Sequence, residues 1–186
     1  MSNPLVSIIT PSFNQGKFIE ETIKSVLSQD YPNIEYIVVD GASTDNTVEI
    51  LKKYKERLRW VSEKDRGQSD AIIKGFKMSS GEILAWLNSD DTYLPGAIQT
   101  VVEYFKLNPN IVMIYGKTYC TDADSRVLGE YPTENFVLKT LATCNYISQS
   151  SVFFRRDAYT AVGGVDRELS YTMDYDLWFK IAKRFS

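Results

Sequence analysis

The chain has 186 residues, which is enough for one compact domain with a sizeable core and too few for two ordinary domains. Hydrophobic residues make up 44% of the chain and charged residues 24%, a balance that excludes an intrinsically disordered protein. The net charge of the chain is −3, and its sequence contains no block of like charges. Nothing therefore indicates a nucleic-acid partner.

The chain contains no histidine. This absence excludes the Ser-His-Asp and Cys-His mechanisms and also histidine-bound zinc. A metal ion would have to be held by oxygen ligands, which favours Mg²⁺ or Mn²⁺. A general base would have to be Asp, Glu, Lys or Tyr.

Cysteine usage and hydropathy indicate the compartment. Cys120 and Cys144 lie far apart and outside any metal-ligand spacing, as expected for reduced thiols. No apolar run reaches the length of a membrane span, and the first residues lack the charged region of a signal peptide. We therefore expect a cytoplasmic protein, with the inner face of the membrane as a second location.

The first half of the chain alternates strand and helix signals. Short apolar runs without clean alternation are typical of parallel strands buried on both faces, and they lie at residues 5–10, 34–39, 58–62 and 83–87. Helical spacing fills the gaps, with these predicted faces: Ile19, Ile23, Val26 and Leu27; Val48, Leu51 and Tyr54; Ile72, Gly75 and Phe76, stopped by Gly81; and Leu94, Ile98, Val101, Val102 and Phe105, with Pro95 in the first turn. This alternation predicts an α/β fold with a mostly parallel sheet.

The second half is less regular. Strands are expected at residues 111–115, 117–121 and 151–154, and residues 126–131 are expected to pair with the second of these. A break at Gly163 and Gly164 precedes a closing helix with Trp178, Ile181, Ala182 and Phe185 on one face. No stop signal follows that helix, so we expect that the chain is truncated at its C-terminus.

Three polar clusters follow predicted strands, at residues 10–14, 40–45 and 88–91. Ligands of an open α/β sheet bind beyond the carboxyl ends of its strands, so these clusters are expected to form one polar pocket. Several carboxylates and two helix N-termini there would suit a phosphate-bearing ligand held through a divalent cation.

Each cluster also has a structural interpretation. Ser43 or Thr44 is expected to cap the following helix. Asp40 ends a buried strand, and we expect its partner to be a ligand hydroxyl or amide in preference to an internal backbone group. Asp90 is favoured as a metal ligand, whereas Asp91 is divided evenly between metal binding and capping the helix near Pro95.

Two further segments are dense in polar residues. Residues 62–70 read as a solvated loop with Ser69 or Asp70 as the N-cap of a helix, within which Asp65 and Arg66 are expected to contact a base and a phosphate. Asp174 is either the N-cap of the closing helix or a general base at the mouth of the pocket. Spacing alone does not decide between these two roles.

Several segments resemble family 2 glycosyltransferases, which have the GT-A fold. The resemblance begins with VSIITPSFNQGKFIEETIKSVLSQDYPNIEYIVVDGASTDNTVEIL and continues through SEKDRGQSDAIIKGF, GEILAWLNSDDTYLPGAI, SQSSVFFRRDAYTAVGGVD and MDYDLWFKIA. It implies a single catalytic domain over residues 1–186, with a nucleotide-binding half at 1–92 and an acceptor-side half at 93–186. The implied reaction is inverting transfer of a sugar from a UDP- or dTDP-sugar to a hydroxyl group of a saccharide or glycolipid.

The resemblance also implies residue roles. The nucleotide-sugar would be bound by Thr10, Pro11, Phe13, Asp40, Asp65, Arg66, Ser89 and Asp90. Asp90 and Asp91 would hold Mg²⁺ or Mn²⁺, and Asp174 would be the catalytic base. The contacts that choose the donor sugar and the acceptor are expected around residues 146–156 and in the missing C-terminal region, which would also provide any contact with the membrane surface.

The chain departs from the family pattern at two positions. The acidic motif often begins with Asp, and Asn88 stands there; the carboxylate before the base is often Glu, and Met173 stands there. A nucleotide-sugar-binding domain without catalytic activity is therefore the alternative. A sugar nucleotidylyltransferase would need a glycine-rich, basic loop after the first strand, and TPSFNQGKF is not such a loop.

Overall fold

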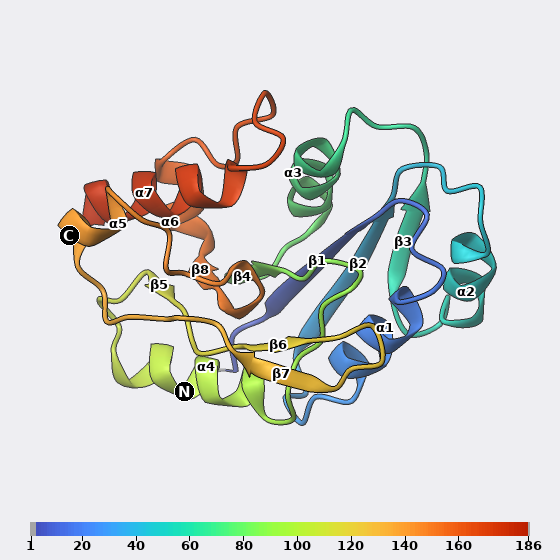
Figure 1. Cartoon of the computed structure of the whole chain (residues 1–186), viewed down its shortest axis with the longest axis horizontal. Coiled ribbons are helices and arrows are strands. Elements are labelled where there is room, and N and C mark those ends of the chain that lie inside the picture. The colour runs from blue at the N-terminus through green and yellow to red at the C-terminus, as the bar shows by residue number, and fades with distance from the viewer. Residues whose placement is uncertain (1–2, 186) are drawn as a thin grey trace.

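A six-stranded sheet forms the centre of the computed structural model, which describes residues 3–185 (Figure 1). Its order is β3-β2-β1-β4-β8-β5. The strands are β1 (Val6–Ser12), β2 (Ile34–Asp40), β3 (Arg59–Ser62), β4 (Ile83–Trp86), β5 (Met113–Ile114) and β8 (Phe153–Arg155). The first four are parallel, and β8 pairs antiparallel with both β4 and β5. The predicted, mostly parallel α/β sheet is therefore confirmed.

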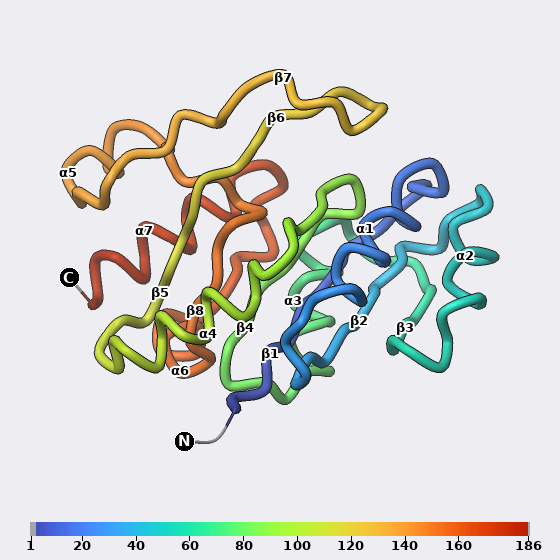
Figure 2. Tube along the Cα trace, turned by 90° about the horizontal axis from the view of Figure 1, so that it is seen from below, coloured from blue at the N-terminus to red at the C-terminus, as the bar shows by residue number. Residues whose placement is uncertain are grey.

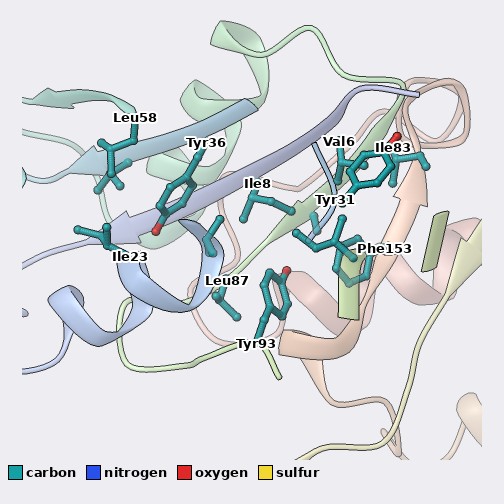
Figure 3. Close-up of a cluster of buried hydrophobic side chains, with 14 of the residues drawn as sticks. Val6, Ile8, Ile23, Tyr31, Tyr36, Leu58, Ile83, Leu87, Tyr93 and Phe153 are labelled. Atoms are coloured by element: carbon teal, nitrogen blue, oxygen red, sulfur yellow. The ribbon is translucent and has the colours of Figure 1, made fainter. Parts of the chain in front are cut away.

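Helices cover both faces of this sheet. On one face lie α1 (Ile19–Leu27), α2 (Thr47–Lys53) and α4 (Ala97–Leu107), which contribute to the hydrophobic cluster of Figure 3. On the other lie α3 (Gln68–Met78), α5 (Leu138–Leu141), α6 (Arg156–Ala161) and α7 (Met173–Phe185), around a second cluster. All seven residues of β1 are buried, because each face of the strand is covered. Within residues 3–185, none of the helices has the length and apolar character needed to cross a membrane.

A two-stranded hairpin stands apart from the sheet. It consists of β6 (Tyr119–Thr121) and β7 (Val127–Glu130), which pair antiparallel as predicted. Every residue of both strands is exposed. Figure 2 shows the two strands running across one side of the molecule, away from the central strands. The strand predicted at residues 111–115 is shorter than expected, and only Met113 and Ile114 pair with β8.

Four predicted helix features are wrong: the placement of Leu94 and Pro95 in α4, of Phe185 on the apolar face of α7, and of Gly81 as the stop of α3. Gly96 has a φ of 77°, a left-handed conformation that a helix cannot contain, so α4 begins only at Ala97. Pro95 and Leu94 precede the helix, and Leu94 is 59% exposed. Phe185 lies off the apolar face of α7 and is 45% exposed.

Gly81 does not stop α3, since the helix already ends at Met78. The glycine is needed for a different reason. Its N–H donates to the Ser7 hydroxyl of β1 at 2.8 Å, and a Cβ on this residue would lie 2.4 Å from the same oxygen.

Two adjacent arginines, Arg155 at the end of β8 and Arg156 at the start of α6, reach the ends of helices on opposite faces of the sheet. Arg155 donates to the carbonyl groups of Ile111 (2.8 Å) and Phe105 (3.2 Å) at the end of α4. Arg156 donates to the Gly81 carbonyl (2.6 Å) and the Ser79 hydroxyl (2.8 Å), just beyond the end of α3. The Phe105 carbonyl in the last turn of α4 and the loop that follows α3 thereby gain charged donors from two adjacent residues.

Candidate functional site

A cavity of about 840 Å³ opens at the carboxyl ends of the parallel strands. We name it the edge cavity. Residues of all three polar clusters line it, as expected for the edge of an open sheet. Among the residues predicted to bind a nucleotide-sugar, Pro11, Phe13, Asp65, Ser89 and Asp90 lie on its wall.

Two loops that carry this wall are hydrogen-bonded to each other. The N–H of Asn14 donates to the Ser43 hydroxyl (2.8 Å), and the Asn14 side-chain oxygen accepts from the N–H of Thr44 (2.8 Å). The N–H of Gly16 donates to the Asp45 carboxylate (2.9 Å). Asn14 and Ala42 both have positive φ angles, 53° and 65°, a strained conformation that surrounding contacts must hold. The loops therefore form a fixed frame for Phe13, whose side chain is 60% exposed.

Thr10 and Asp40 do not line the edge cavity. Thr10 is fully buried, two residues before the end of β1, and its hydroxyl lies 3.0 Å from the Tyr36 hydroxyl. Asp40 has no exposed surface. Its carboxylate accepts from Ser62 (2.6 Å) and from both the N–H (3.0 Å) and the hydroxyl of Ser43.

Asp40 was expected to bind a ligand group, but its hydrogen-bond partners are groups of the protein itself. The capping role expected for Ser43 or Thr44 is also wrong, since the N-cap of α2 is Asn46 and the N–H of Thr47, the first residue of the helix, donates to the Asp45 carboxylate (3.0 Å). Ser43 is occupied instead with Asp40 and Asn14, because the loop turns back over the end of β2.

The N-terminus of α3 forms another wall of the edge cavity. Gly67 is the N-cap, which corrects the expectation of Ser69 or Asp70. Asp65 accepts from the Gly67 N–H at 2.8 Å and lies against the cavity, whereas Arg66 is exposed and does not line it. A helix N-terminus presents unpaired N–H groups, which favour an anion.

Residues 88–91 form a turn after β4 that we name the acidic turn. Asp90 is exposed, and Ser89 is buried. Burial, and then the negative charge of Asp90, raises the pKa of the Asp91 carboxyl group from 3.8 to about 6. A hydrogen bond from the Asn88 side chain acts in the opposite direction. Asp91 does not cap α4, whose N-cap is Gly96.

The acidic turn offers carboxylate oxygens of the type that Mg²⁺ and Mn²⁺ prefer. The mutual repulsion of Asp90 and Asp91 is the kind that a cation between them would relieve. Within residues 3–185, however, no group of three or more His, Cys, Asp or Glu side chains is placed to hold a metal ion. The donor set fits a cation that takes its other ligands from phosphate oxygens and water.

A second cavity, of about 1160 Å³, lies on the other side of the acidic turn. We name it the hairpin cavity, because α1, α4 and the β6–β7 hairpin bound it. Asp90 lines both cavities, and Asp91 lines this one. Ser148, Ser150 and Ser151 also line it, within the range expected for donor-sugar and acceptor contacts.

Asp174 is the second residue of α7, so it is not the N-cap of that helix. It lines neither cavity. Burial raises the pKa of its carboxyl group, while hydrogen bonds from the N–H of Tyr175 and from its own N–H act in the opposite direction. Met173, in the place of the family's Glu, is buried in the second hydrophobic cluster, which accounts for an apolar residue there.

The segment before α7 is attached to the wall of the edge cavity. Arg167 forms an ion pair with Asp70 of α3, with 2.9 Å between Nε and Oδ1. The Ser69 hydroxyl of the same helix donates to the Leu169 carbonyl. Both contacts lie at the N-terminal end of α3, so they connect the approach to Asp174 with the edge cavity.

Sequence reasoning missed several residues of the site. The Ser12 hydroxyl lines the edge cavity, is buried, and has no hydrogen-bond partner among the residues that the structure describes. Gln68 lines the same cavity and donates to the Asn88 side chain at 2.7 Å. Position gave a signal for Ser12, which is the last residue of β1, but no local pattern pairs Gln68 with a residue twenty positions away.

Comparisons with known proteins agree with this geometry. The model of "Glycosyl transferase family 2" matches residues 7–163. An uncharacterized glycosyltransferase of Rickettsia prowazekii is 32% identical over 190 residues, covering 96% of this chain and 58% of the relative. The chain thus spans less than two thirds of that protein.

Two solved structures show the same fold. A mannosyltransferase of Pyrobaculum calidifontis, in complex with GDP-Man and Mn²⁺, matches with a TM-score of 0.76 at 21% identity over 100% of this chain and 54% of that one. S. aureus TarS 1–349, in complex with UDP-GlcNAc, matches with a TM-score of 0.74 at 19% identity over 95% of this chain and 53% of that one. The predicted GT-A fold is confirmed.

Proposed function

Because the chain belongs to glycosyl transferase family 2, we propose that it binds a nucleotide-diphospho-sugar and transfers the sugar to a hydroxyl group with inversion. One observation carries this proposal. The edge cavity and the hairpin cavity meet at Asp90, so a donor on one side and an acceptor on the other would meet at the acidic turn.

The donor would occupy the edge cavity. Pro11, Phe13 and Asp65 line the part between the two hydrogen-bonded loops and α3, where we place the nucleoside. The diphosphate would lie toward Ser89, Asp90 and the N-terminus of α3, whose N–H groups favour negative charge. Arg66, which is exposed beside this cavity, would add a charged donor on the outside.

Thr10 and Asp40 would support the nucleotide indirectly. Asp40 fixes Ser43 and Ser62, and Ser43 in turn fixes the loop that carries Phe13. The nucleotide is a UDP or dTDP derivative in our proposal, and the GDP-Man complex of the P. calidifontis enzyme makes guanosine donors the comparison to test.

Asp90 and Asp91 would hold Mg²⁺ or Mn²⁺ together with the diphosphate. When bound, such a cation supplies positive charge against the negative charge that builds on the leaving diphosphate. Asp90 is exposed and reachable by the ligand, whereas Asp91 is partly buried beneath it. Both positions suit a cation that arrives with its phosphate ligands.

Asp174 would act as the general base. It would take the proton of the acceptor hydroxyl while that oxygen attacks the anomeric carbon and the bond to the diphosphate breaks, which inverts the anomeric centre. A carboxyl pKa raised by burial moves toward the working pH, where a general base is most effective. Proton removal by such a group typically contributes about 10²–10⁴-fold.

The acceptor, a saccharide or glycolipid, would enter through the hairpin cavity. That cavity combines serine hydroxyl groups with Tyr104 and Tyr119, side chains that offer hydrogen bonds and flat apolar faces to a sugar. It is large enough for more than one sugar unit, since ligand pockets typically measure about 300–1,000 Å³.

The experiment starts with donor identity. A thermal-shift screen with UDP-, dTDP- and GDP-sugars in Mn²⁺ is expected to show a nucleotide-specific rise in Tm, because binding stabilises the folded state. Release of the nucleotide is then measured with a panel of acceptor glycosides. Asp174→Ala is expected to abolish sugar transfer, while the affinity for the nucleotide in Mn²⁺ stays within about twofold of the wild-type value. The loss of activity would then be confined to the general-base step.

Asp90→Ala is expected to weaken nucleotide binding in Mn²⁺, and Asp30→Ala, an exposed aspartate outside both cavities, provides the matched control. A wild-type chain that binds the nucleotide but transfers no sugar with any acceptor would establish the binding-only alternative. The absence of any Tm rise would contradict the donor site itself.

A further inference from the structure

Helix α4 has two apolar faces. Its core face is buried against the sheet and consists of Ile98, Val102 and Phe105. A second stripe is formed by Ala97, Val101 and Tyr104, which are four and three residues apart and therefore share one side of the helix. This stripe lines the hairpin cavity and extends along α4 for about 10 Å.

Two isoleucines that follow α4 continue this apolar wall. Ile111 and Ile114 are half-buried, because they pack against the first hydrophobic cluster and also line the hairpin cavity. Arg155 holds this segment beside the helix, since it donates to the carbonyl groups of Ile111 (2.8 Å) and Phe105 (3.2 Å). We name the stripe of α4 together with Ile111 and Ile114 the aliphatic groove.

The aliphatic groove is continuous with the acidic turn. Residues 92–96 connect that turn to α4, and all of them line the same cavity. At the acidic turn the cavity wall is polar, with Asp90 and the side chains of Ser148, Ser150 and Ser151. The hairpin cavity therefore has a polar end at the proposed reaction centre and an apolar extension that leads away from it along α4.

We infer that the acceptor is a sugar carried on a lipid, whose sugar lies at the acidic turn and whose aliphatic chain lies in the aliphatic groove. This inference rests on the proposed function and chooses between its two classes of acceptor. Each hydroxyl of a second sugar unit would lose water in the groove and would need a new hydrogen-bond partner. Thr100, beside the stripe, already donates its hydroxyl to the Gly96 carbonyl (2.8 Å). An aliphatic chain needs no such partner and gains from burial.

The continuity of the groove with the acidic turn favours a ligand over a polypeptide partner. A polypeptide segment in the groove would occupy the cavity beside the carboxylates at which the acceptor hydroxyl must react. A chain attached to the acceptor itself fills the groove and places the sugar in the same binding event.

The experiment measures affinity for methyl, butyl, hexyl and octyl β-glucosides by ligand-observed NMR, each below its critical micelle concentration. The sugar is constant in this series, so a change in affinity reports on the chain. Each methylene group that is fully buried raises affinity about fourfold. We expect a rise of at least about tenfold from butyl to octyl, since part of the chain stays exposed.

Two variants of nearly unchanged shape test the position of the chain. Val101→Thr places a hydroxyl in the groove and is expected to lower the ratio of octyl to methyl glucoside affinity at least about threefold. Thr100→Val adds apolar surface at an exposed position of the same cavity and is expected to raise that ratio. Val48→Thr, at a half-buried valine of α2 outside both cavities, is the matched control.

An octyl glucoside that binds no more tightly than butyl glucoside would overturn the inference and leave donor binding untouched. An unchanged ratio in both groove variants would also overturn it, because the chain would then lie elsewhere. In nucleotide release, octyl glycosides are expected to show a KM at least about tenfold below that of methyl glycosides of the same sugar, and equal values would contradict a lipid-linked acceptor. A wild type that binds no nucleotide-sugar in Mn²⁺ would overturn the proposed function, and with it the role of the groove in acceptor binding.

Discussion

The two sides of the acidic turn are built differently. On the edge-cavity side, the loops that follow β1 and β2 are joined through Asn14, Ser43 and Asp45. All of β1 and the last five residues of β2 are buried. On the hairpin-cavity side, β6 and β7 are exposed along their whole length, and Ser125 in their turn reaches the body through one hydroxyl bond to Glu21 at 2.8 Å. A two-stranded hairpin has only marginal stability by itself.

This difference suits the two tasks in the proposed function. A diphosphate and a nucleoside are common to many donors, and a fixed frame recognises them with little ordering cost. Acceptors differ more, and a hairpin with few buried contacts can adapt its position to them. We therefore expect the two sides of the acidic turn to differ in local stability. The predictions below test that difference.

The largest expected contrast is in hydrogen exchange. Amides of β1 and β2 are expected to exchange only through global unfolding, whereas those of β6 and β7 open locally. We expect protection factors to differ by at least about a thousandfold, measured by mass spectrometry at pH 7. Equal protection of the hairpin and β1 would show that the hairpin is as firmly held as the sheet.

A matched pair of aspartates tests the loops directly. Asp45 accepts from the N–H groups of Gly16 and Thr47 and from the Thr47 hydroxyl, and Asp122 accepts from the N–H groups of Asp124 and Arg126 in the hairpin. We expect Asp45→Ala to lower the free energy of unfolding by about 2 kcal/mol. Asp122→Ala is expected to change it by less than about 0.5 kcal/mol, because the hairpin already opens locally. Urea denaturation measures both, and equal losses would contradict the contrast.

Asp45 also gives a pH dependence. Burial raises the pKa of its carboxyl group, but hydrogen bonds from Thr47 and Gly16 outweigh that effect, so the pKa lies below its usual value. Its contribution to stability is therefore complete above the unfolded-state pKa and is lost as the pH falls through the lower folded-state value. The stability difference between wild type and Asp45→Ala is expected to shrink on acidification below pH 4.

At Asp91 we expect a smaller pH dependence of stability, with the opposite sign to that at Asp45. Its folded-state pKa of about 6 exceeds the usual 3.8, so wild-type stability falls as the pH rises through that range. Asp91→Asn removes the buried charge and is expected to stabilise the metal-free protein by about 1 kcal/mol at pH 8. The same variant is expected to lose the Tm rise given by Mn²⁺ with UDP. A variant that is less stable than the wild type at pH 8 would contradict the cause assigned to the raised pKa.

The smallest effect is expected at Leu128, which is 71% exposed on β7. Leu128→Ser is expected to change the free energy of unfolding by less than about 0.5 kcal/mol, because little apolar surface is buried there. A loss of more than about 1 kcal/mol by urea denaturation would show that Leu128 is covered in solution.

Sequence patterns predicted the fold because each of its helices and strands is formed by residues that are close together in the sequence. The apolar runs that became β1 to β4 and the pairing of β6 with β7 follow from spacing within short windows. The start of α4 was missed because it depends on the left-handed backbone of Gly96, which the apolar spacing does not reveal.

The site was predictable only in part. Polar residues at strand ends pointed to Asp65, Ser89 and Asp90, all on the wall of the edge cavity. The partner of Asp40 was missed because Ser62 comes from the next strand of the sheet. Of the hairpin cavity, only the segment at residues 146–156 was expected to contact ligands, since the other walls come from segments as far away in the sequence as Phe18.

Arg155 at the end of β8 and Arg156 at the start of α6 set a lower limit on the length of a working fragment. Residues 1–92 include every residue that lines the edge cavity, yet β4 near the end of this range pairs with β8, and Arg156 reaches the loop after α3. A fragment that ends at residue 92 would expose the edge of β4 and leave the carbonyl groups after α3 without their charged donor. The residues that line the edge cavity all lie in the first half of the chain, but part of their structural support is supplied by residues 153–156.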